Sequence, residues 1–336
     1  MPHTLITGPN GFLGATMVAA ALSAGHRITG TVRSMKAGKD LLAVHPEWDH
    51  SLVDFVEVPD YTTEGVFDEI FKKGGFDYVL HTAAPVLDDP KNTDFERDFE
   101  KPSVAGNMQL LTSAAKYGKG IKAIAVTSSI NSITIGNDVQ TRELNANEWL
   151  PLDREDAIKM QNSYVSYCVG KKLAEKAIWK FVDEEKPPFT ITTCVPCLIF
   201  GPPLQAVKDL KRLNWSTAQL YSLFNGSNET IPPTSLAAYV DARDLALAHI
   251  LSLTNPNAAN KRFLFGHPIT YQEIADILKS VPGVKDRLAK DSHEKPPIPK
   301  VDMAATDDIL GIKWRSKQQT FTDAAKGILD LEQRLG

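Results

Sequence analysis

The stretch that decides the fold is "TGPNGFLG", residues 7–14. It follows the β-rich run "HTLI" and precedes residues 12–24, whose pattern predicts a helix. Gly8, Gly11 and Gly14 let the chain turn tightly and come close to another group. A helix that starts this way presents free N–H groups and a partial positive charge, so we expect it to bind the pyrophosphate of a dinucleotide. A plain tight turn between strand and helix is the alternative.

The rest of the N-terminal part alternates β-rich and helical stretches. The expected strands cover 3–8, 26–32, 53–58, 77–84, 121–129 and 190–201, and the expected helices cover 12–24, 63–73, 103–117 and 163–185. Such alternation predicts right-handed crossovers and a parallel sheet. The nearly apolar runs "VLHTAA" (79–84) and "AIAVTSS" (123–129) are typical of strands buried on both faces. The sequence therefore predicts an α/β fold with a doubly wound parallel sheet.

The pattern changes after about residue 203, where proline-rich stretches separate shorter elements. Residues 241–253 predict a helix capped by Asp241, and residues 270–281 predict one with a capping box of Thr270 and Glu273. We therefore expect a cofactor-binding domain over 1–202, to which part of 239–265 returns. Residues 203–336 should form a smaller α/β domain that mainly binds the substrate.

Composition excludes several classes of protein. The 336 residues are 43% hydrophobic and 23% charged, with a net charge of −4, so no basic surface for nucleic acid is indicated. No apolar run is long enough to cross a membrane, and three cysteines are too few for a disulfide framework. The eight histidines lack metal-ligand spacing. We expect a cytoplasmic protein, because the first strand leaves no room for a signal peptide. We also expect it to bind no metal and to be a monomer or a homodimer.

The end of the second expected strand indicates which dinucleotide binds. "GTVRSMKAGK" (30–39) offers Arg33, Lys36 and Lys39, and no acid occurs before Asp40. An acid at this place would bind the ribose 2′-OH of NAD, whereas a guanidinium suits the 2′-phosphate of NADP. We therefore expect NADP(H). A solvated basic helix start is the alternative.

The third expected strand ends in "VPDYT" (58–62). Asp60 in this stretch is a candidate partner for the adenine amino group, with Tyr61 beside it. An ordinary turn residue is an equally good interpretation of Asp60.

The stretch "NSYVSYCVGKKLAEK" (162–176) contains two tyrosines and three lysines on one expected helix. Residues four apart share a helix face, and only Tyr167 and Lys171 make such a pair. In carbonyl reduction a phenol can protonate the oxygen that gains charge, and a nearby ammonium lowers the pKa of that phenol. The lysine can also hydrogen-bond the nicotinamide ribose.

Hydroxyl groups at the end of the fifth strand supply a third donor. In "AVTSSINS" (125–132), alternation places Ser129 on the same side as Thr127 and Ser128 on the opposite side. Irregular backbone at a strand end would weaken this argument, so Ser128 and Ser129 both stay open at this point.

Taken together, these stretches resemble the extended short-chain dehydrogenases/reductases. More narrowly, the chain is similar to fungal NADPH-dependent aldehyde, ketone and methylglyoxal reductases, relatives of plant dihydroflavonol reductases. The resemblance also rests on the stretches "LHTAAPV", "IFGPP" and "YVDARDLALAH". It therefore runs from residue 4 to about 249, and "DILGIKWRS" (308–316) also fits. It implies a Rossmann domain followed by a small substrate domain.

The resemblance assigns catalysis to Ser129, Tyr167 and Lys171. It implies cofactor contacts from the glycine turn, the basic strand end and the later edge of the sheet. These expected contacts are Gly8, Asn10, Gly11, Phe12, Leu13, Gly14, Arg33, Lys36, Asp60, Tyr61, Ala83, Thr127, Tyr167, Lys171, Pro196, Ile199 and Ser216. The chain departs from the family where Ser103 takes the place of an active-site asparagine, and at Leu198, where an aromatic residue is frequent.

Position near the same edge of the sheet indicates the substrate pocket. We expect mainly apolar walls, which favour an uncharged carbonyl over an acid. The candidates are Val86, Leu87, Asn131, Tyr164, Leu198 and Phe224.

The predicted function is an NADPH-dependent carbonyl reductase that converts an aldehyde or ketone to an alcohol. One alternative is an NAD(P)-dependent sugar-nucleotide epimerase or dehydratase, and another is a non-catalytic nicotinamide-sensing regulator. Cys194 and Cys197 form a C-x-x-C pair, but their apolar strand favours packing over redox or zinc chemistry. We likewise expect His81 to be a hydrogen-bonded core residue.

Overall fold

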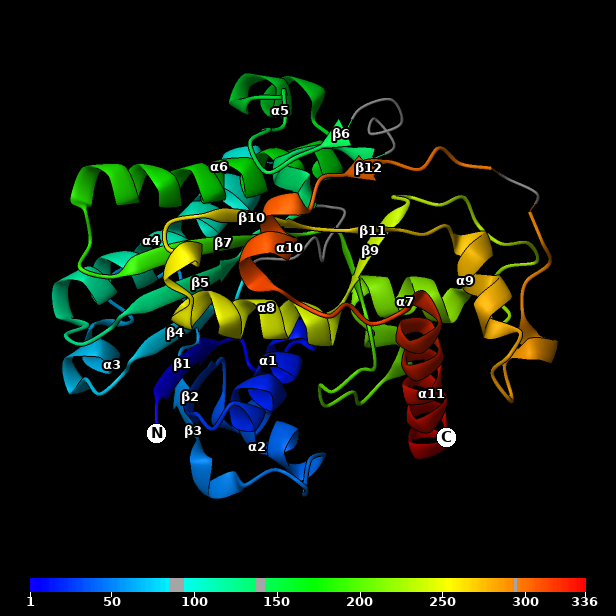
Figure 1. Cartoon of the computed structure of the whole chain (residues 1–336), viewed down its shortest axis with the longest axis horizontal. Helices are drawn as coiled ribbons and strands as arrows, with labels where there is room; N and C mark the ends of the chain where they lie inside the picture. The colour runs from blue at the N-terminus through cyan, green and yellow to red at the C-terminus, as the bar shows by residue number, and fades with distance from the viewer. Residues whose placement is uncertain (85–93, 137–142, 293–294) are drawn as a thin grey trace.

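The structure, a computed structural model, describes residues 1–84, 94–136, 143–292 and 295–336. Its main sheet has seven parallel strands in the order β10-β7-β5-β4-β1-β2-β3 (Figure 1). The order runs outward in both directions from the β1–β4 pair, as in a doubly wound Rossmann sheet, so the predicted fold class is confirmed. The strands are β1 (His3–Thr7), β2 (Arg27–Val32), β3 (Val53–Glu57), β4 (Tyr78–His81), β5 (Ala123–Thr127), β7 (Thr190–Pro196) and β10 (Arg262–Phe265).

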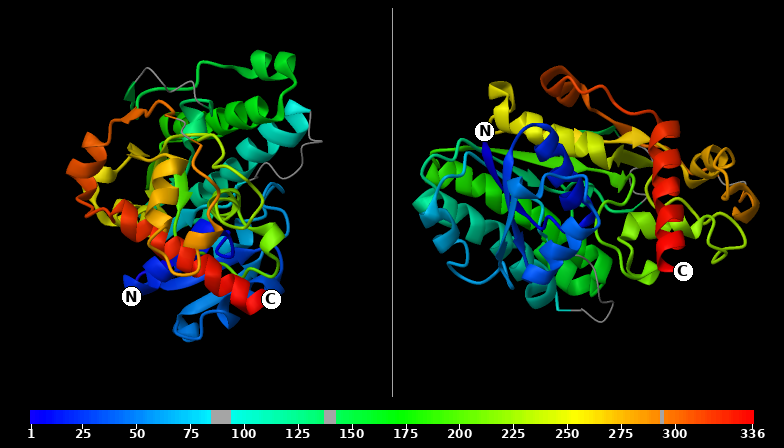
Figure 2. Two further views of the ribbon diagram at one scale, coloured as in Figure 1. Left: turned by 90° about the vertical axis from the view of Figure 1, so that its right-hand side faces the viewer. Right: turned by 90° about the horizontal axis from the view of Figure 1, so that it is seen from below.

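Helices cover both faces of this sheet because successive strand residues point to opposite sides. Leu5 and Ile124 pack with α3, α4 and α6, whereas their neighbours Ile6 and Ala125 pack with α1 and α8. The right-hand view of Figure 2 shows α8 on one side of the strands and α4 and α6 on the other. The helices are α1 (Phe12–Ser23), α2 (Met35–Ala43), α3 (Asp68–Lys73), α4 (Lys101–Tyr117), α6 (Ser163–Glu185) and α8 (Ala242–Thr254).

A second group of elements lies beyond the carboxyl ends of β7 and β10, on the right of Figure 1. A three-stranded sheet in the order β11-β9-β8 packs with three helices around a separate apolar core. Its members are β8 (Leu198–Phe200), β9 (Ala238–Asp241), β11 (His267–Pro268), α7 (Trp215–Ser222), α9 (Tyr271–Leu278) and α11 (Lys317–Leu335). The described chain also contains the short strands β6 (Glu143–Leu144) and β12 (Lys300–Val301) and the short helices α5 (Arg154–Met160) and α10 (Ala304–Leu310).

The chain passes between the two sheets through single residues. Cys197 joins β7 to β8, and Gly266 joins β10 to β11. The two joints touch, because the amide of Cys197 donates to the carbonyl of Phe265 at 2.8 Å and a Cβ on Gly266 would lie 2.6 Å from Cys197 Sγ. Cys194 and Cys197 are both buried free thiols, as expected for packing residues. The division of the chain at residue 202 stays a prediction, although β10 and α8 lie on the main sheet.

Several expected elements differ in extent from the observed ones. The expected helix 63–73 is shortened to α3, since Gly65 adopts φ +69° and ends any earlier helical run. The expected strand 190–201 divides at Cys197 into two strands of different sheets. By contrast, α6 covers 163–185 as predicted, and both predicted caps form: Asp241 accepts from Arg243 N, and Thr270 pairs with Glu273 in a capping box.

Candidate active site

The glycine turn between β1 and α1 is shaped by close backbone contacts. Gly8 adopts φ +67°, and a Cβ on Gly14 would lie only 2.0 Å from the Gly8 carbonyl oxygen. Helix α1 begins after Gly11, its first turn holds no acid, and no side chain of the described residues caps it. The turn therefore leaves N–H groups and a partial positive charge open to an anion. This arrangement fits a dinucleotide pyrophosphate, as predicted for Asn10, Phe12 and Leu13.

The end of β4 lies against the same turn. The backbone N–H groups of Thr82 and Ala83 donate to Thr7 Oγ1 at 3.1 and 3.0 Å. A Cβ on Gly8 would lie 3.3 Å from the Cα of Ala83. The structure thus places Ala83 beside the glycine turn, at the β1–β4 switch point where ligands of doubly wound sheets bind.

The basic end of β2 is exposed. Arg33 is exposed and makes no ion pair with another described residue. Lys36 pairs with Asp40 at 2.9 Å along α2, and the backbone N–H of Met35 donates to Glu57 at 2.9 Å. The guanidinium of Arg33 is therefore available to an anion at the expected 2′-phosphate position, whereas Lys36 already has an acidic partner.

Asp60 is engaged in its own turn. Its carboxylate accepts from the hydroxyl and the backbone N–H of Thr62 at 2.6 and 2.9 Å, and these bonds lower the pKa of Asp60. The ring of Tyr61 packs on α4, where a Cβ on Gly106 would lie 2.1 Å from it. The turn interpretation of Asp60 is thus observed, and its contact with adenine stays a prediction.

Helix α6 carries the Tyr167–Lys171 pair. It begins at the cap residue Asn162, whose side chain accepts from the backbone N–H groups of Tyr164 and Val165 at 2.9 and 3.1 Å. Lys171 Nζ lies 5.6 Å from the centre of the Tyr167 ring. Both residues are half-buried, so the helix presents them together on its inner face.

The two serines after β5 turn to different partners. Ser129 interacts through its side chain with Tyr167, and it also accepts from the backbone N–H of Asn131 at 3.2 Å. Ser128 instead donates to the carboxylate of Glu175 at 2.6 Å. Of the two hydroxyls left open by the sequence pattern, Ser129 is therefore the one beside the phenol.

Burial sets the protonation of the pair. Burial raises the pKa of Tyr167, and the hydrogen bond from Ser129 only partly opposes this. Burial also lowers the pKa of Lys171 to about 8. The expected lowering of the tyrosine pKa by Lys171 is not observed here, because removal of the phenol from water raises that pKa instead. At neutral pH the phenol is protonated and most of the lysine carries its charge.

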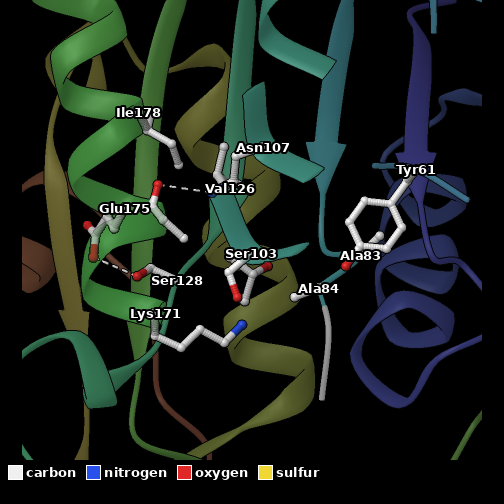
Figure 3. Close-up of a pocket in the computed structure, with 12 residues that line it drawn as sticks. Tyr61, Ala83, Ala84, Ser103, Asn107, Val126, Ser128, Lys171, Glu175 and Ile178 are labelled. Atoms are coloured by element: carbon white, nitrogen blue, oxygen red, sulfur yellow. Dashed lines mark hydrogen bonds between the residues drawn. The ribbon is translucent and has the colours of Figure 1, made fainter. Parts of the chain in front are cut away.

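A small cavity is lined by Lys171 and by Ala83, the residue beside the glycine turn (Figure 3). Its volume of about 20 Å³ is enough for a single water molecule. In Figure 3 the amine of Lys171 is turned toward Ser103, with Ala84 near it and Tyr61 on the far side. The lining residues are Tyr61, Ala83, Ala84, Ser103, Asn107, Val126, Thr127, Ser128, Lys171, Ala174, Glu175 and Ile178.

Asn107 and Glu175 line this cavity and were not among the predicted site residues. Asn107 accepts from His81 at 3.1 Å and donates to the carbonyl of Ala174 at 3.1 Å, so it ties α4 to α6. His81 also bonds Thr7 at 2.8 Å, and burial lowers its pKa to about 4, so it is the satisfied core residue that we expected. Asn107 follows Ser103 by one helical turn, a spacing that would have predicted the shared face.

Glu175, the second, is the centre of a buried polar network. It pairs with Arg262 at 2.8 Å, where the two side chains are only 1% and 9% exposed. It also accepts from the hydroxyls of Ser132 and Thr193 at 2.9 and 2.7 Å. Burial is the largest single effect and raises the pKa of this carboxyl, but the charge of Arg262 and the hydrogen bonds from Arg262, Ser128 and Thr193 together lower it overall. The position of Glu175, one turn after Lys171, was the available signal.

Predicted cofactor contacts on the other side of the site also come together. The hydroxyl of Ser216, at the start of α7, donates to the carbonyl of Ile199 at 2.6 Å. Pro196 is the buried last residue of β7. Thr127 lines the cavity, and its hydroxyl is bonded to His249 Nε2 at 2.9 Å.

The structure describes only some of the predicted substrate residues. Val86 and Leu87 lie outside the described residues. Tyr164 is 40% exposed, and its hydroxyl accepts from the backbone N–H of Gly136 at 3.2 Å. Leu198 is half-buried between two apolar clusters. Phe224 is 1% exposed inside the C-terminal core, so contact with a substrate would require this packing to change.

Within the described ranges, no three His, Cys, Asp or Glu side chains are grouped to hold a metal ion. No helix of the same ranges is long and apolar enough to span a membrane.

Comparison with known proteins places the fold and the glycine turn in a family. A model described as "NAD dependent epimerase/dehydratase family" matches residues 4–266. The chain belongs to this family. The resemblance to extended short-chain dehydrogenases/reductases is thereby confirmed.

Individual relatives match along nearly the whole chain. An uncharacterized oxidoreductase of Schizosaccharomyces pombe is 33% identical over 96% of this chain and 95% of its own length. The NADPH-dependent methylglyoxal reductase of Saccharomyces cerevisiae is 29% identical over 98% of this chain and 99% of its own. The crystal structure of a yeast methylglyoxal/isovaleraldehyde reductase complexed with NADPH has a TM-score of 0.87 at 28% identity, covering 99% of both chains.

Proposed function

We propose that this chain is an NADPH-dependent reductase that converts an aldehyde or ketone to an alcohol, with Ser129, Tyr167 and Lys171 as catalytic residues. The observation that carries the proposal is the contact of Ser129 with Tyr167, one helical turn from Lys171. Similarity to NADPH-dependent methylglyoxal reductases supports the same reaction class and the same cofactor. We also propose a cytoplasmic enzyme that acts on a small-molecule carbonyl as a monomer or homodimer.

Ser129, Tyr167 and Lys171 would each have a separate role in carbonyl reduction. Bound NADPH would supply a hydride to the carbonyl carbon, so that negative charge would develop on the carbonyl oxygen. Ser129 donates a hydrogen bond to that oxygen, where a positioned donor stabilises the developing charge. Tyr167 then gives its proton to the oxygen, which completes the alcohol and leaves a phenolate. The ammonium of Lys171 stabilises this phenolate until a proton from solvent restores the phenol.

Burial suits Tyr167 to this role. A phenol whose pKa is raised stays protonated at neutral pH, so it is ready to act as the acid in reduction. Lys171, with a pKa of about 8, is charged in most molecules at neutral pH without an acidic partner among the described residues. Such a free charge can respond to the phenolate that forms in the reaction.

Different residues support the proposed choice of cofactor and the proposed choice of substrate. The exposed guanidinium of Arg33 supports NADPH over NADH, because it is available to the 2′-phosphate. We propose that residues 1–202, with part of 239–265, bind the cofactor and that 203–336 mainly bind the substrate. The half-buried apolar side chain of Leu198 and the exposed ring of Tyr164 support an uncharged substrate.

The test is a substrate panel with the purified chain. Methylglyoxal, an α-diketone and an aryl ketone are offered with NADPH or NADH, and cofactor oxidation is followed. We expect turnover with at least one of these carbonyls and a clear preference for NADPH. Absence of turnover with all of them, together with conversion of a UDP-sugar without added carbonyl, would instead establish the epimerase alternative.

A further inference from the structure

A segment of the C-terminal part reaches back to α2, next to the basic strand end. Residues 202–214 connect β8 to α7 and therefore lie between Ile199 and Ser216, two predicted cofactor contacts. The start of the segment is fixed on α11, where a Cβ on Gly327 would lie 2.7 Å from the ring of Pro203. We call residues 204–212 the strap.

The strap is attached to the cofactor side by buried and polar contacts. His45, at the end of α2 and 7% exposed, bonds the carbonyl of Leu204 through Nε2 at 2.6 Å. The side chain of Leu204 packs against the apolar core under α1 and α8. Within the strap, Gln205 donates to Asn214 at 3.2 Å while its own amide oxygen is buried without a partner among the described residues. These contacts hold the strap against α2 independently of any surface charge.

Two lysines meet on one carboxylate at this contact. Lys208, from the strap, and Lys36, from the first turn of α2, both donate to Asp40. Hydrogen bonds from Lys208 and then Lys36 lower the pKa of Asp40, so the carboxylate is ionised at neutral pH. One negative charge thus faces two ammonium groups, which leaves an excess positive charge beside Arg33. The nearest opposing acid on the neighbouring strand is Glu57, which accepts from Met35 N.

We propose that Lys208 is a specificity-determining residue that binds the 2′-phosphate of NADP together with Arg33 and Lys36. Asp40 holds both lysines at the position that the phosphate reaches, and a dianion satisfies their ammonium groups better than one shared carboxylate. Because the strap connects Ile199 to Ser216 along the chain, the phosphate would also hold the segment that links these two predicted cofactor contacts. This inference rests on the proposed use of NADP(H), and it adds a contact from the C-terminal part.

Binding of cofactor fragments tests the inference without any reaction. Calorimetry with the full chain compares 2′,5′-ADP, which carries the 2′-phosphate, with 5′-ADP, which lacks it. We expect Lys208→Ala to weaken binding of 2′,5′-ADP by about fivefold, the size of one exposed charge-assisted contact, and to leave 5′-ADP unchanged. The matched control is Lys211→Ala, because Lys211 is an exposed lysine of the same strap with no ion pair in the described part of the chain.

The same variants are then assayed for reduction of methylglyoxal. We expect the KM for NADPH to rise in Lys208→Ala while the KM for NADH and both kcat values stay near wild type. Equal behaviour of Lys208→Ala and Lys211→Ala toward 2′,5′-ADP would overturn the role of Lys208 and leave the reductase proposal intact. A wild-type chain that binds both nucleotides equally, or that reduces no carbonyl, would count against the proposed function itself.

Discussion

The hydroxyl of Ser128 donates a hydrogen bond of 2.6 Å to the buried carboxylate of Glu175. The adjacent Ser129 turns instead to Tyr167. Ser128 therefore supports the packing of β5 and α6, and Ser129 lies with the proposed catalytic residues. The two neighbouring hydroxyls should consequently respond in different ways to the same substitution.

Ser129→Ala should lower kcat by about a hundredfold or more, the usual loss when one donor to a developing oxyanion is removed. Ser128→Ala should keep kcat within a few-fold but lower the free energy of unfolding by about 1–3 kcal/mol, because Glu175 loses a buried partner. Steady-state kinetics and urea unfolding of both variants separate these effects. A larger loss of kcat in Ser128→Ala would reverse the assignment.

Tyr167→Phe should abolish carbonyl reduction, with kcat reduced by about a hundredfold or more, because the substrate oxygen loses its proton donor. Binding of NADPH should be unchanged, since the ring and its packing remain. NADPH oxidation with methylglyoxal and a separate titration of NADPH binding make the comparison. Turnover at the wild-type rate in this variant would refute the mechanism.

Arg33→Asp should raise the KM for NADPH by about tenfold or more, since it replaces a donor to the 2′-phosphate with a repelling charge. The KM for NADH should change far less or even fall. Kinetics with both cofactors at a fixed carbonyl concentration provide the measurement. Equal changes for the two cofactors would contradict the 2′-phosphate assignment.

The dependence of kcat/KM on pH should reflect the loss of the positive charge of Lys171. Its pKa is lowered to about 8 by burial, so the ammonium is lost as the pH rises through that value. We expect kcat/KM for NADPH to decline above about pH 8, because the neutral amine no longer stabilises the phenolate. Lys176→Met, which removes an exposed lysine of the same helix, should keep this decline. A flat profile through this range would exclude Lys171 as the charge that matters.

Glu175→Ala should destabilise the protein by about 3–5 kcal/mol, since Arg262 would remain as an uncompensated buried charge. The lowered pKa of Glu175 stabilises the fold above the unfolded pKa, and this contribution is lost as the pH falls through the folded value. The variant should therefore lose less of its remaining stability in acid. Glu69→Ala, which breaks the exposed pair with Lys72, is the control and should change little.

Local patterns explain which features the sequence could predict. The cap at Asn162 and the four-residue spacing of Tyr167 and Lys171 lie within one helix, so the helix and its pair follow from neighbouring residues alone. The glycine turn is equally local. The shortening of α3 at Gly65 could have been anticipated from the glycine, although its positive φ is visible only in the fold.

Polar contacts between distant segments could not be predicted in the same way. Arg262 reaches Glu175 across 87 positions, and Lys208 reaches Asp40 across 168. No period or motif links such residues, because their contact depends on which strand lies at the edge of the sheet and where a loop folds back. The choice between Ser128 and Ser129 likewise needed the position of Glu175 on α6.

The single-residue joints at Cys197 and Gly266 have a consequence for recombination between proteins of this architecture. Helix α8 and strand β10 lie downstream of residue 202, yet they complete the main sheet. A fragment that stops at 202 would thus lack an edge strand and one of the two helices, α1 and α8, that pack on the same face, and it would expose apolar surface. Under the proposed division of the chain, a donor's substrate range would have to be transplanted as two inserts, about 198–241 and 267–336, into a discontinuous cofactor-binding part.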